Sequence, residues 1–279
     1  MLLVIDVGNT NIVLGLYSGK KLLRSWRMAT GQNRTSDEMG IFIYSLLSHK
    51  GVSPDSLKSI IISSVVPNIM YSLTNGIRKY FDISPIIVSK DMTLGIKLNQ
   101  VGQRELGSDR IVNCVAGFKL YGGPIIIIDY GTATTYDIVS QDGEFLTGIT
   151  APGIKISAEA LFARAALLGN VELNLPSSII VNSTADSVKA GILFGNIGQT
   201  EYIVNRLKNE LNTPNAKVIA TGGLANTIAR GTDIFDHIEP ALTLEGLRIL
   251  YELNEPSGLN EPNGLNKFNQ LNEDDNENR

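Results

Sequence analysis

Two short segments of this 279-residue chain repeat one arrangement of residues that suits phosphate binding. Residues 3–10 read Leu-Val-Ile-Asp-Val-Gly-Asn-Thr, and residues 126–134 read Ile-Ile-Ile-Asp-Tyr-Gly-Thr-Ala-Thr. Each is an apolar strand that ends in Asp-x-Gly and small polar residues. The glycine lets the backbone approach a ligand closely, and the hydroxyl and N–H groups after it can donate to phosphate oxygens. A carboxylate reaches phosphate through a bridging cation, so two such turns facing each other predict a phosphate clamp.

The alternative interpretation is that both segments are ordinary hairpins with Asp-x-Gly turn chemistry. One copy by itself would favour ordinary hairpins, whereas two copies in matching contexts favour the clamp. Other nucleotide-binding signatures are missing, since the chain has neither Gly-x-x-x-x-Gly-Lys-[Ser/Thr] nor Gly-x-Gly-x-x-Gly after a strand. A P-loop enzyme and a Rossmann dehydrogenase are therefore not expected.

Residues 107–110, Gly-Ser-Asp-Arg, place a proton acceptor and an anion-binding guanidinium side by side before a predicted helix. In phosphoryl transfer an Asp can orient a substrate hydroxyl and accept its proton, while an Arg binds an anionic group. A helix-capping Asp beside a solvated Arg fits the same spacing equally well. Residues 221–223, Thr-Gly-Gly, follow a predicted strand and form either a surface for a flat ring such as adenine or a simple turn.

The elements that must hold these segments form a pattern that occurs twice. Each Asp-x-Gly strand is followed by two strand-like runs with a Ser-Gly or Asp-Gly turn between them, which is a hairpin signal. Helices and short buried strands then alternate, so the chain is predicted to be a duplicated α/β fold with two mixed sheets. The further strands are expected at residues 12–17, 22–28, 60–64, 86–88, 135–139, 144–150 and 218–220, and the helices at residues 36–49, 67–80, 111–121, 153–168, 185–211 and 242–253.

The charge distribution separates residues 254–279 from the rest of the chain. Their six acidic and two basic side chains account for the whole formal charge of −4, so residues 1–253 are neutral. A neutral body argues against non-specific binding of nucleic acid and gives no electrostatic reason to sit on an anionic membrane. Residues 254–279 form a decaying six-residue repeat rich in Asn, Gly and acidic residues, for which we expect disorder.

Two further features bear on the cellular setting. Cys114 is the only cysteine and lies among apolar residues, so we expect a buried structural thiol. The N-terminus has no basic region or small-residue cleavage site, and apolar runs such as residues 125–128 are far shorter than a membrane span. We therefore expect a cytoplasmic protein.

Together these segments resemble the type III pantothenate kinases, of the superfamily that also contains actin and the sugar kinases. The resemblance covers residues 1 to about 254 and is carried by residues 6–11 (Asp-Val-Gly-Asn-Thr-Asn), 107–110 and 129–137 (Asp-Tyr-Gly-Thr-Ala-Thr-Thr-Tyr-Asp). Residues 151–153 (Ala-Pro-Gly), 221–223 and 242–248 (Leu-Thr-Leu-Glu-Gly-Leu-Arg) add to it.

The resemblance implies an actin-like (ribonuclease-H-like) fold with two similar domains, residues 1–117 and 118–253, and a nucleotide cleft between them. It implies ATP-dependent phosphorylation of the primary hydroxyl of pantothenate to 4'-phosphopantothenate, the first step toward coenzyme A. It also implies a homodimer whose active site lies near the dimer interface. The cofactors would be ATP with Mg²⁺ and a monovalent cation, K⁺ or NH₄⁺, and no nucleic acid or membrane partner is expected.

The family's functional positions carry over onto residues of this chain. Asp109 would be the catalytic base, Asp129 would bind the monovalent cation, and Asp6 would lie near the magnesium ion. The residues expected to bind ATP are Asp6, Val7, Gly8, Asn9, Thr10, Asn11, Ile12, Val13 and Thr132. The residues expected to bind pantothenate are Gly107, Ser108, Asp109, Arg110 and Thr184. Because pantothenate carries a carboxylate, Arg110 has a natural partner in it.

The chain departs from the family pattern in two places. Most members carry Tyr followed by Asn-Pro where this chain has Gln100, Gly102 and Gln103, which alters part of the expected pantothenate wall. The usual Gly-Gly-x-Ile reads Thr-Gly-Ile-Thr at residues 147–150, a milder packing change.

Three other functions remain open from the sequence. They are another small-molecule kinase of the same superfamily, a non-enzymatic regulatory relative, and a structural ATPase of the actin kind. The neutral body argues against direct DNA binding, and the presence of Asp109 with both phosphate turns favours an active enzyme.

Overall fold

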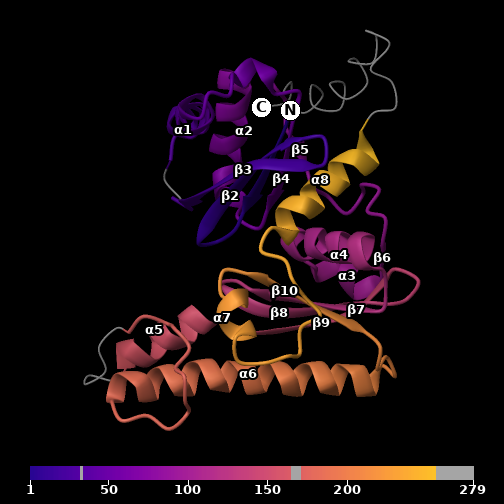
Figure 1. Ribbon diagram of the computed structural model, residues 1–279. Coiled ribbons are helices and arrows are strands. Elements are labelled where there is room, and N and C mark those ends of the chain that lie inside the picture. Colours follow the sequence, from indigo (N-terminus) through magenta and orange to yellow (C-terminus); the bar gives the residue numbers. More distant parts are fainter. Residues whose placement is uncertain (32–33, 165–170, 256–279) are drawn as a thin grey trace, which may run out of the picture.

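The structure, a computed structural model, describes residues 1–31, 34–164 and 171–255. In this part of the chain two mixed β-sheets lie one beyond the other, each with helices beside it (Figure 1). None of the helices in the described ranges is both long and apolar enough to span a bilayer.

The first sheet has the strand order β3-β2-β1-β4-β5. Its central strand β1 pairs antiparallel with β2 and parallel with β4, so a three-stranded meander is extended by crossover strands. β1 and β4 are buried along nearly their whole length, as expected for strands covered on both faces. The strands are β1 (Leu2–Val7), β2 (Asn11–Ser18), β3 (Lys21–Ala29), β4 (Ser59–Ser64) and β5 (Ile86–Ile87).

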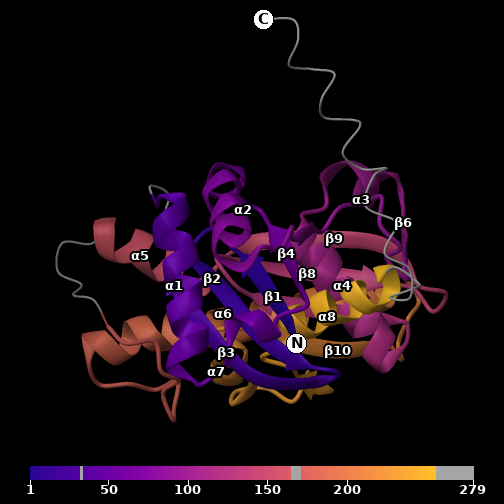
Figure 2. The same ribbon diagram turned by 90° about the horizontal axis from the view of Figure 1, so that it is seen from above.

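Two helices pack against the outer face of the first sheet and lie side by side in both views (Figures 1 and 2). α1 (Ser36–His49) begins after Thr35, whose side chain forms a capping box with Glu38. The short helix η1 (Pro54–Ser56) precedes β4. α2 (Pro67–Phe81) has a proline at its start, where a missing N–H costs no hydrogen bond.

The second sheet repeats this topology with the order β11-β10-β7-β8-β9-β6. β7 pairs antiparallel with β8 and parallel with β10, as β1 does with β2 and β4. The long helix α6 packs with α7 and the start of α5 on its outer face (Figure 1). The strands are β6 (Lys97–Leu98), β7 (Ile125–Tyr130), β8 (Ala133–Val139), β9 (Glu144–Pro152), β10 (Lys217–Gly222) and β11 (His237–Ile238), and the helices are α5 (Ile154–Arg164), α6 (Thr184–Glu210) and α7 (Ala225–Ala229).

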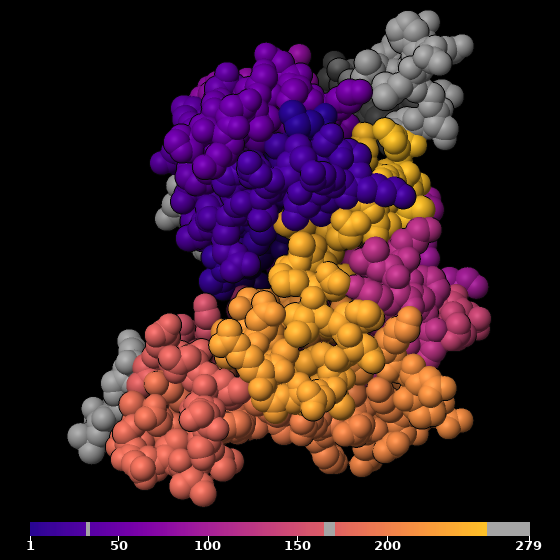
Figure 3. Space-filling view, viewed as in Figure 1, coloured from indigo at the N-terminus to yellow at the C-terminus, as the bar shows by residue number. Residues whose placement is uncertain are grey.

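Two helices lie between the sheets and share one apolar core with the inner faces of both. They are α4 (Ser108–Tyr121) and α8 (Leu242–Asn254), and α3 (Gln100–Glu105) lies just before α4. Gly246 of α8 lies so close to α4 that a Cβ there would collide with the carbonyl oxygen of Val112. In the space-filling view α8 and the segment before it, in yellow, run between the indigo first half and the orange second half (Figure 3).

The duplicated α/β fold with two mixed sheets is confirmed. The sequence did not reveal β6, β11, α3 and α7, because two-residue strands and one-turn helices have no periodicity to detect. β6 belongs to residues 1–117 yet pairs with β9 of the second sheet, and the domain boundary after residue 117 stays a prediction.

The C-terminal end of the fold lies one residue beyond the predicted helix. Asn254 is the last residue of α8, and its side chain accepts from the N–H of Thr93 and donates to the carbonyl of Thr93, both at 2.9 Å. Residues 256–279 lie outside the described residues, so the predicted disorder of the tail stays a prediction.

Candidate active site

The two Asp-x-Gly turns meet between the sheets. The hydroxyl oxygens of Thr10 and Thr132, one from each turn, are 2.9 Å apart. Asp6 and Asp129 occupy the same position, next to last, in β1 and β7. The turns therefore face each other, which is the arrangement that a phosphate clamp requires. The residues expected to bind ATP lie in and around the two turns. β1 ends with Asp6 and Val7, the first turn consists of Gly8, Asn9 and Thr10, and β2 begins with Asn11, Ile12 and Val13. The second turn contains Thr132.

Asp6 carries a buried carboxylate oxygen that is not satisfied by the protein. Its Oδ1 is buried, and within the described residues it has no hydrogen-bond partner. Burial, followed by the negative charges of Asp109 and Asp129, raises the pKa of Asp6 to about 7. An unpaired buried carboxylate is costly, so a cation or a proton is needed at this position.

Asp129 differs because one of its oxygens has a donor. The Nδ2 of Asn113 donates to Oδ2 of Asp129 at 3.1 Å. Burial and then the charge of Asp109 raise the pKa of Asp129 to about 6, while the hydrogen bond from Asn113 opposes the rise. On the other side, Gly222 has a φ of +91°, and a Cβ there would lie 2.5 Å from Oδ1 of Asp129. The glycine of the 221–223 segment thus leaves room for this carboxylate.

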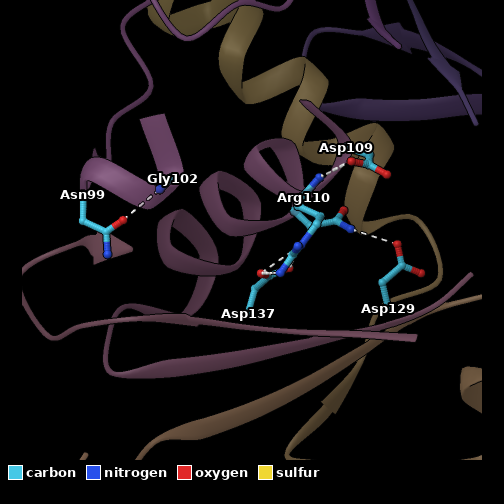
Figure 4. A network of polar contacts seen from close by, with 7 residues as sticks. Asn99, Gly102, Asp109, Arg110, Asp129 and Asp137 are labelled. Carbon is cyan, nitrogen blue, oxygen red and sulfur yellow. Dashed lines mark hydrogen bonds and ion pairs between the residues drawn. The ribbon is translucent and has the colours of Figure 1, made fainter. Parts of the chain in front are cut away.

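Asp109 lies in the first turn of α4, and its negative charge contributes to the raised pKa of both turn aspartates, Asp6 and Asp129. The helix starts after Gly107 with no side-chain cap, and Oδ1 of Asp109 accepts from the N–H of Arg110 at 2.8 Å. Burial raises the pKa of Asp109, and this rise is opposed by the N–H and the charge of Arg110. A raised pKa suits a group that must accept a proton near neutral pH. Figure 4 shows Asp109, Arg110 and Asp129 in one region around α4.

Ser108 anchors the start of α4 to the first sheet. Its hydroxyl donates to the carbonyl of Ser64 at 2.9 Å and accepts from the hydroxyl of Ser63 at 3.1 Å. Ser63 pairs with Asp6 across the parallel strands β4 and β1. The segment 107–110 is therefore held beside the first phosphate turn by β4, which sequence reasoning did not identify as part of the site.

Arg110 is not a free anion binder in this structure. Its Nη2 and Nε form an ion pair with Asp137 of β8, at 2.5 Å and 3.1 Å from Oδ1, and the Asp137 side chain is 2% exposed (Figure 4). Gly148 of β9 makes room for the pair, since a Cβ there would collide with Nη2 of Arg110. The expected pairing of Arg110 with the pantothenate carboxylate stays a prediction.

Thr184 is not brought to this cluster within one chain. It is the first residue of α6 and is exposed, after the N-cap Ser183. In Figures 1 and 2 this end of α6 lies at the side of the molecule away from α4. The residues at the altered family positions lie in α3: Gln100 and Gln103 are exposed, whereas Gly102 is buried and donates its N–H to Oδ1 of Asn99 at 2.8 Å (Figure 4).

The donor set fits a cation that is completed by phosphate and water. Within the described residues no three His, Cys, Asp or Glu side chains converge closely enough to form a metal site by themselves. Asp6 and Asp129 also form no ion pair with any described Lys or Arg. Mg²⁺ in nucleotide sites commonly keeps its waters and takes one or two carboxylates plus phosphate oxygens, and the orphaned oxygen of Asp6 matches that requirement.

A pocket of about 380 Å³ adjoins the glycine pair after β10. It is lined by α5, residues 171–173 and Leu224, which follows Gly222 and Gly223. Its size is within the range of small-molecule sites, and its apolar side chains suit a flat ring. The pocket therefore keeps the adenine interpretation of residues 221–223 open as a prediction.

The chain is similar to known proteins of one family. The family model described as "Type III pantothenate kinase" matches residues 2–206. The type III pantothenate kinase of Agathobacter rectalis is 47% identical over 93% of this chain and 100% of its own length. That of Geobacillus kaustophilus is 50% identical over 91% of this chain and 98% of its own length.

Among solved structures, a candidate 2-dehydro-3-deoxygalactonokinase from Sinorhizobium meliloti superposes with a TM-score of 0.57 at 13% identity. The match covers 93% of this chain and 99% of that one. At this identity the likeness concerns the fold alone, and it confirms the actin-like, sugar-kinase architecture.

Proposed function

The chain belongs to the type III pantothenate kinase family, whose members phosphorylate pantothenate in coenzyme A biosynthesis, and from that premise we propose how its own residues carry out the transfer. The observation that carries the proposal is the gathering of Asp6, Asp109 and Asp129 at the place where the two turns meet. Each of the three has a raised pKa, and Asp109 contributes to raising the pKa of the other two.

Asp109 is the catalytic base. It accepts the proton of the primary hydroxyl of pantothenate while that oxygen bonds to the γ-phosphorus, and the bond from phosphorus to the β–γ bridging oxygen breaks to release ADP. A primary alcohol is a poor nucleophile at neutral pH, so its placement by Asp109 supplies much of the rate. The raised pKa of Asp109, caused mainly by burial, supports this role.

The two turns bind ATP, with Asp6 facing the magnesium ion and Thr132 donating to a phosphate. The buried, unpartnered Oδ1 of Asp6 supports this assignment. When bound, Mg²⁺ and the monovalent cation neutralise negative charge on the phosphates and on the transferring group. The hydroxyls of Thr10 and Thr132, 2.9 Å apart, would then separate and donate to phosphate oxygens. We assign the adenine ring to the pocket beside Leu224.

Asp129 binds the monovalent cation, K⁺ or NH₄⁺. Its Oδ2 accepts from Asn113, whereas Oδ1 has no hydrogen-bond donor among the described residues and lies on the side of Gly131 and Gly222. Asn113 therefore orients the carboxylate without neutralising its charge, which suits a group that must hold a singly charged ion.

Pantothenate binds along Gly107, Ser108 and Arg110, and Thr184 reaches it from a second subunit of a homodimer. Two observations support the dimer. Thr184 is remote from Asp109 within one chain, and large apolar side chains are exposed in and just before α6, with Ile180 83% and Tyr202 66% exposed. Such side chains are typical of protein interfaces. We also assign the enzyme to the cytoplasm, where coenzyme A precursors are handled.

The test is a coupled assay of ADP release with purified protein, with and without pantothenate, in potassium buffer. Asp109→Asn should lower kcat by about 10³-fold and leave the thermal unfolding midpoint close to that of the wild type, because the side chains have the same shape. Asp142→Asn, at an exposed acidic residue in the turn between β8 and β9, is the matched control. Near-normal turnover of Asp109→Asn would contradict the assignment of the base.

A further inference from the structure

Asn113 connects the proposed cation ligand to a helix that contacts both sheets. It lies one turn after Asp109 on α4 and is 1% exposed. Its Nδ2 donates to Oδ2 of Asp129 at 3.1 Å, and its Oδ1 accepts from the hydroxyl of Thr243 at 2.8 Å. The three side chains come from α4, β7 and α8, so the chain of hydrogen bonds exists only in the folded protein.

The carboxylate of Asp129 decides which way the amide of Asn113 points, and the hydroxyl of Thr243 holds the other end of that amide. The two ends of an amide have nearly the same shape, and only their hydrogen-bond partners distinguish them. Because a carboxylate only accepts, the NH₂ group of Asn113 faces Asp129, and its Oδ1 is left to accept from the hydroxyl of Thr243. In the opposite orientation the amide oxygen would face the carboxylate of Asp129, and the hydrogen bond to Asp129 would be lost.

The hydrogen bond from Thr243 to Asn113 depends on the close packing of α8 against α4. Gly246, three residues further along α8, leaves no room for a Cβ against the carbonyl of Val112, the neighbour of Asn113. The two helices thus approach at the level where Thr243 meets Asn113. α8 also packs against β1, the strand that carries Asp6.

We propose that Asn113 and Thr243 are positioning residues that hold Asp129 with Oδ1 directed at the monovalent cation. This inference rests on the proposed cation role of Asp129. With Oδ2 held by Asn113, the carboxylate cannot rotate away, and Oδ1 stays beside the backbone of Gly131 and Gly222. Residues that orient a metal ligand from behind typically alter metal affinity by about 10–100-fold when removed.

The experiment compares Thr243→Val, which keeps the shape and removes the donor, with Thr243→Ser, which keeps the donor. Asn113→Leu removes the whole amide. Thr200→Val is the matched control, because Thr200 is also fully buried and its hydroxyl bonds Tyr130 at 2.8 Å and Tyr136, away from Asp129.

Two quantities are measured for each variant. One is the KCl concentration that gives half-maximal rate in the coupled assay. The other, obtained without substrates, is the rise in the thermal unfolding midpoint when KCl replaces tetramethylammonium chloride at equal ionic strength. The second readout reports cation binding by the free protein and does not depend on turnover.

Thr243→Val should raise the half-maximal KCl concentration about tenfold and remove most of the KCl-dependent rise in the midpoint. Asn113→Leu should do so at least as strongly. Thr243→Ser should stay within about twofold of the wild type, since it restores the donor. Thr200→Val should lower the midpoint in both salts and leave the half-maximal KCl concentration unchanged.

A normal KCl response in Thr243→Val would overturn the inference while leaving the cation role of Asp129 intact. An equal loss of the response in Thr200→Val would overturn it as well, because the effect would then be one of general packing. A wild-type protein that responds to KCl in neither readout would instead refute the proposed cation role and, with it, the positioning roles of Asn113 and Thr243.

Discussion

The two halves of the molecule carry the same turn in the same register, but they surround its aspartate differently. Asp6 lies opposite Val13 and beside Ser63, and Asp129 lies opposite Thr135 and beside a threonine of β10. Among the described residues a side-chain amide donates to Asp129, from Asn113 of α4, and none donates to Asp6. Burial is the main cause that raises both pKa values, that of Asp6 to about 7 and that of Asp129 to about 6.

A second matched position differs more strongly. In the first copy Val4 of β1 pairs with Gly15 of β2, and in the second copy Ile127 of β7 pairs with Asp137 of β8. Gly15 and Asp137 therefore occupy equivalent positions. Gly15 leaves space that Leu244 of α8 fills, whereas Asp137 holds Arg110 of α4. The roles that we propose for the two copies differ because α4 and α8, which lie between them, present different groups to each sheet.

In the comparison of the two copies, the largest effect should come from exchanging the turn aspartates for asparagine one at a time. Asp6→Asn should lower kcat/KM for ATP on the order of 100-fold, because the carboxylate charge that faces the magnesium ion is lost. Asp129→Asn should act mainly on the half-maximal KCl concentration. Steady-state kinetics with ATP, Mg²⁺ and KCl varied separately will distinguish them. If both variants changed the same parameters equally, the two copies would not have distinct roles.

Removing the ion pair of the second copy should have the next largest effect. Asp137→Asn keeps the shape but leaves Arg110 without a charged partner, and we expect a loss of about 2 kcal/mol in the free energy of unfolding. The KM for pantothenate should rise about tenfold with a smaller change in kcat, because the guanidinium is no longer held. Urea unfolding and pantothenate titrations measure both. An unchanged KM would show that Arg110 does not depend on Asp137 for its position.

Gly222 offers a more local test of the second copy. Gly222→Ala puts a methyl group 2.5 Å from Oδ1 of Asp129 at a φ of +91°, which should cost about 2 kcal/mol of stability and several-fold in activity. The control is Gly191→Ala in α6, where a Cβ meets nothing within 4 Å and where alanine favours the helix. Thermal unfolding of both variants makes the comparison, and a tolerated Gly222→Ala would contradict the tight fit around Asp129.

The smallest effect concerns pH and is seen without ATP or added divalent ions. A carboxyl whose pKa is raised on folding binds more protons in the native state, so its contribution to stability is greatest below its unfolded pKa and declines as pH rises through the folded value. The thermal unfolding midpoint should therefore fall by a few degrees between pH 5 and pH 8, through the range of Asp129 at about 6 and Asp6 at about 7. Asp6→Asn should flatten the upper part of this decline. A midpoint that rises with pH in the wild type would refute the assigned shifts.

Much of the fold could be read from the sequence because its signals are local. The helix predicted at residues 36–49 is observed with those limits, and the Asp-Gly and Ser-Gly turns predicted both hairpins. The short elements were missed, including α3, because its six residues give no periodic pattern and its start depends on Asn99. The residues of the turns were found, whereas their partners Asn113, Thr243 and Asp137 were not assigned any role.

By itself the sequence determined the duplicated fold and predicted the two phosphate turns and the candidate base, since these predictions rest on short runs of residues adjacent in the chain. Only the tertiary structure decided what each charged group meets. In the folded chain Arg110 forms an ion pair with Asp137, and Asn113 donates a hydrogen bond to Asp129. Thr184 lies away from these residues at the exposed start of α6 (Figure 1). These contacts arise where α4 and α8 pack between two sheets, and no local pattern encodes which side chains that packing brings together.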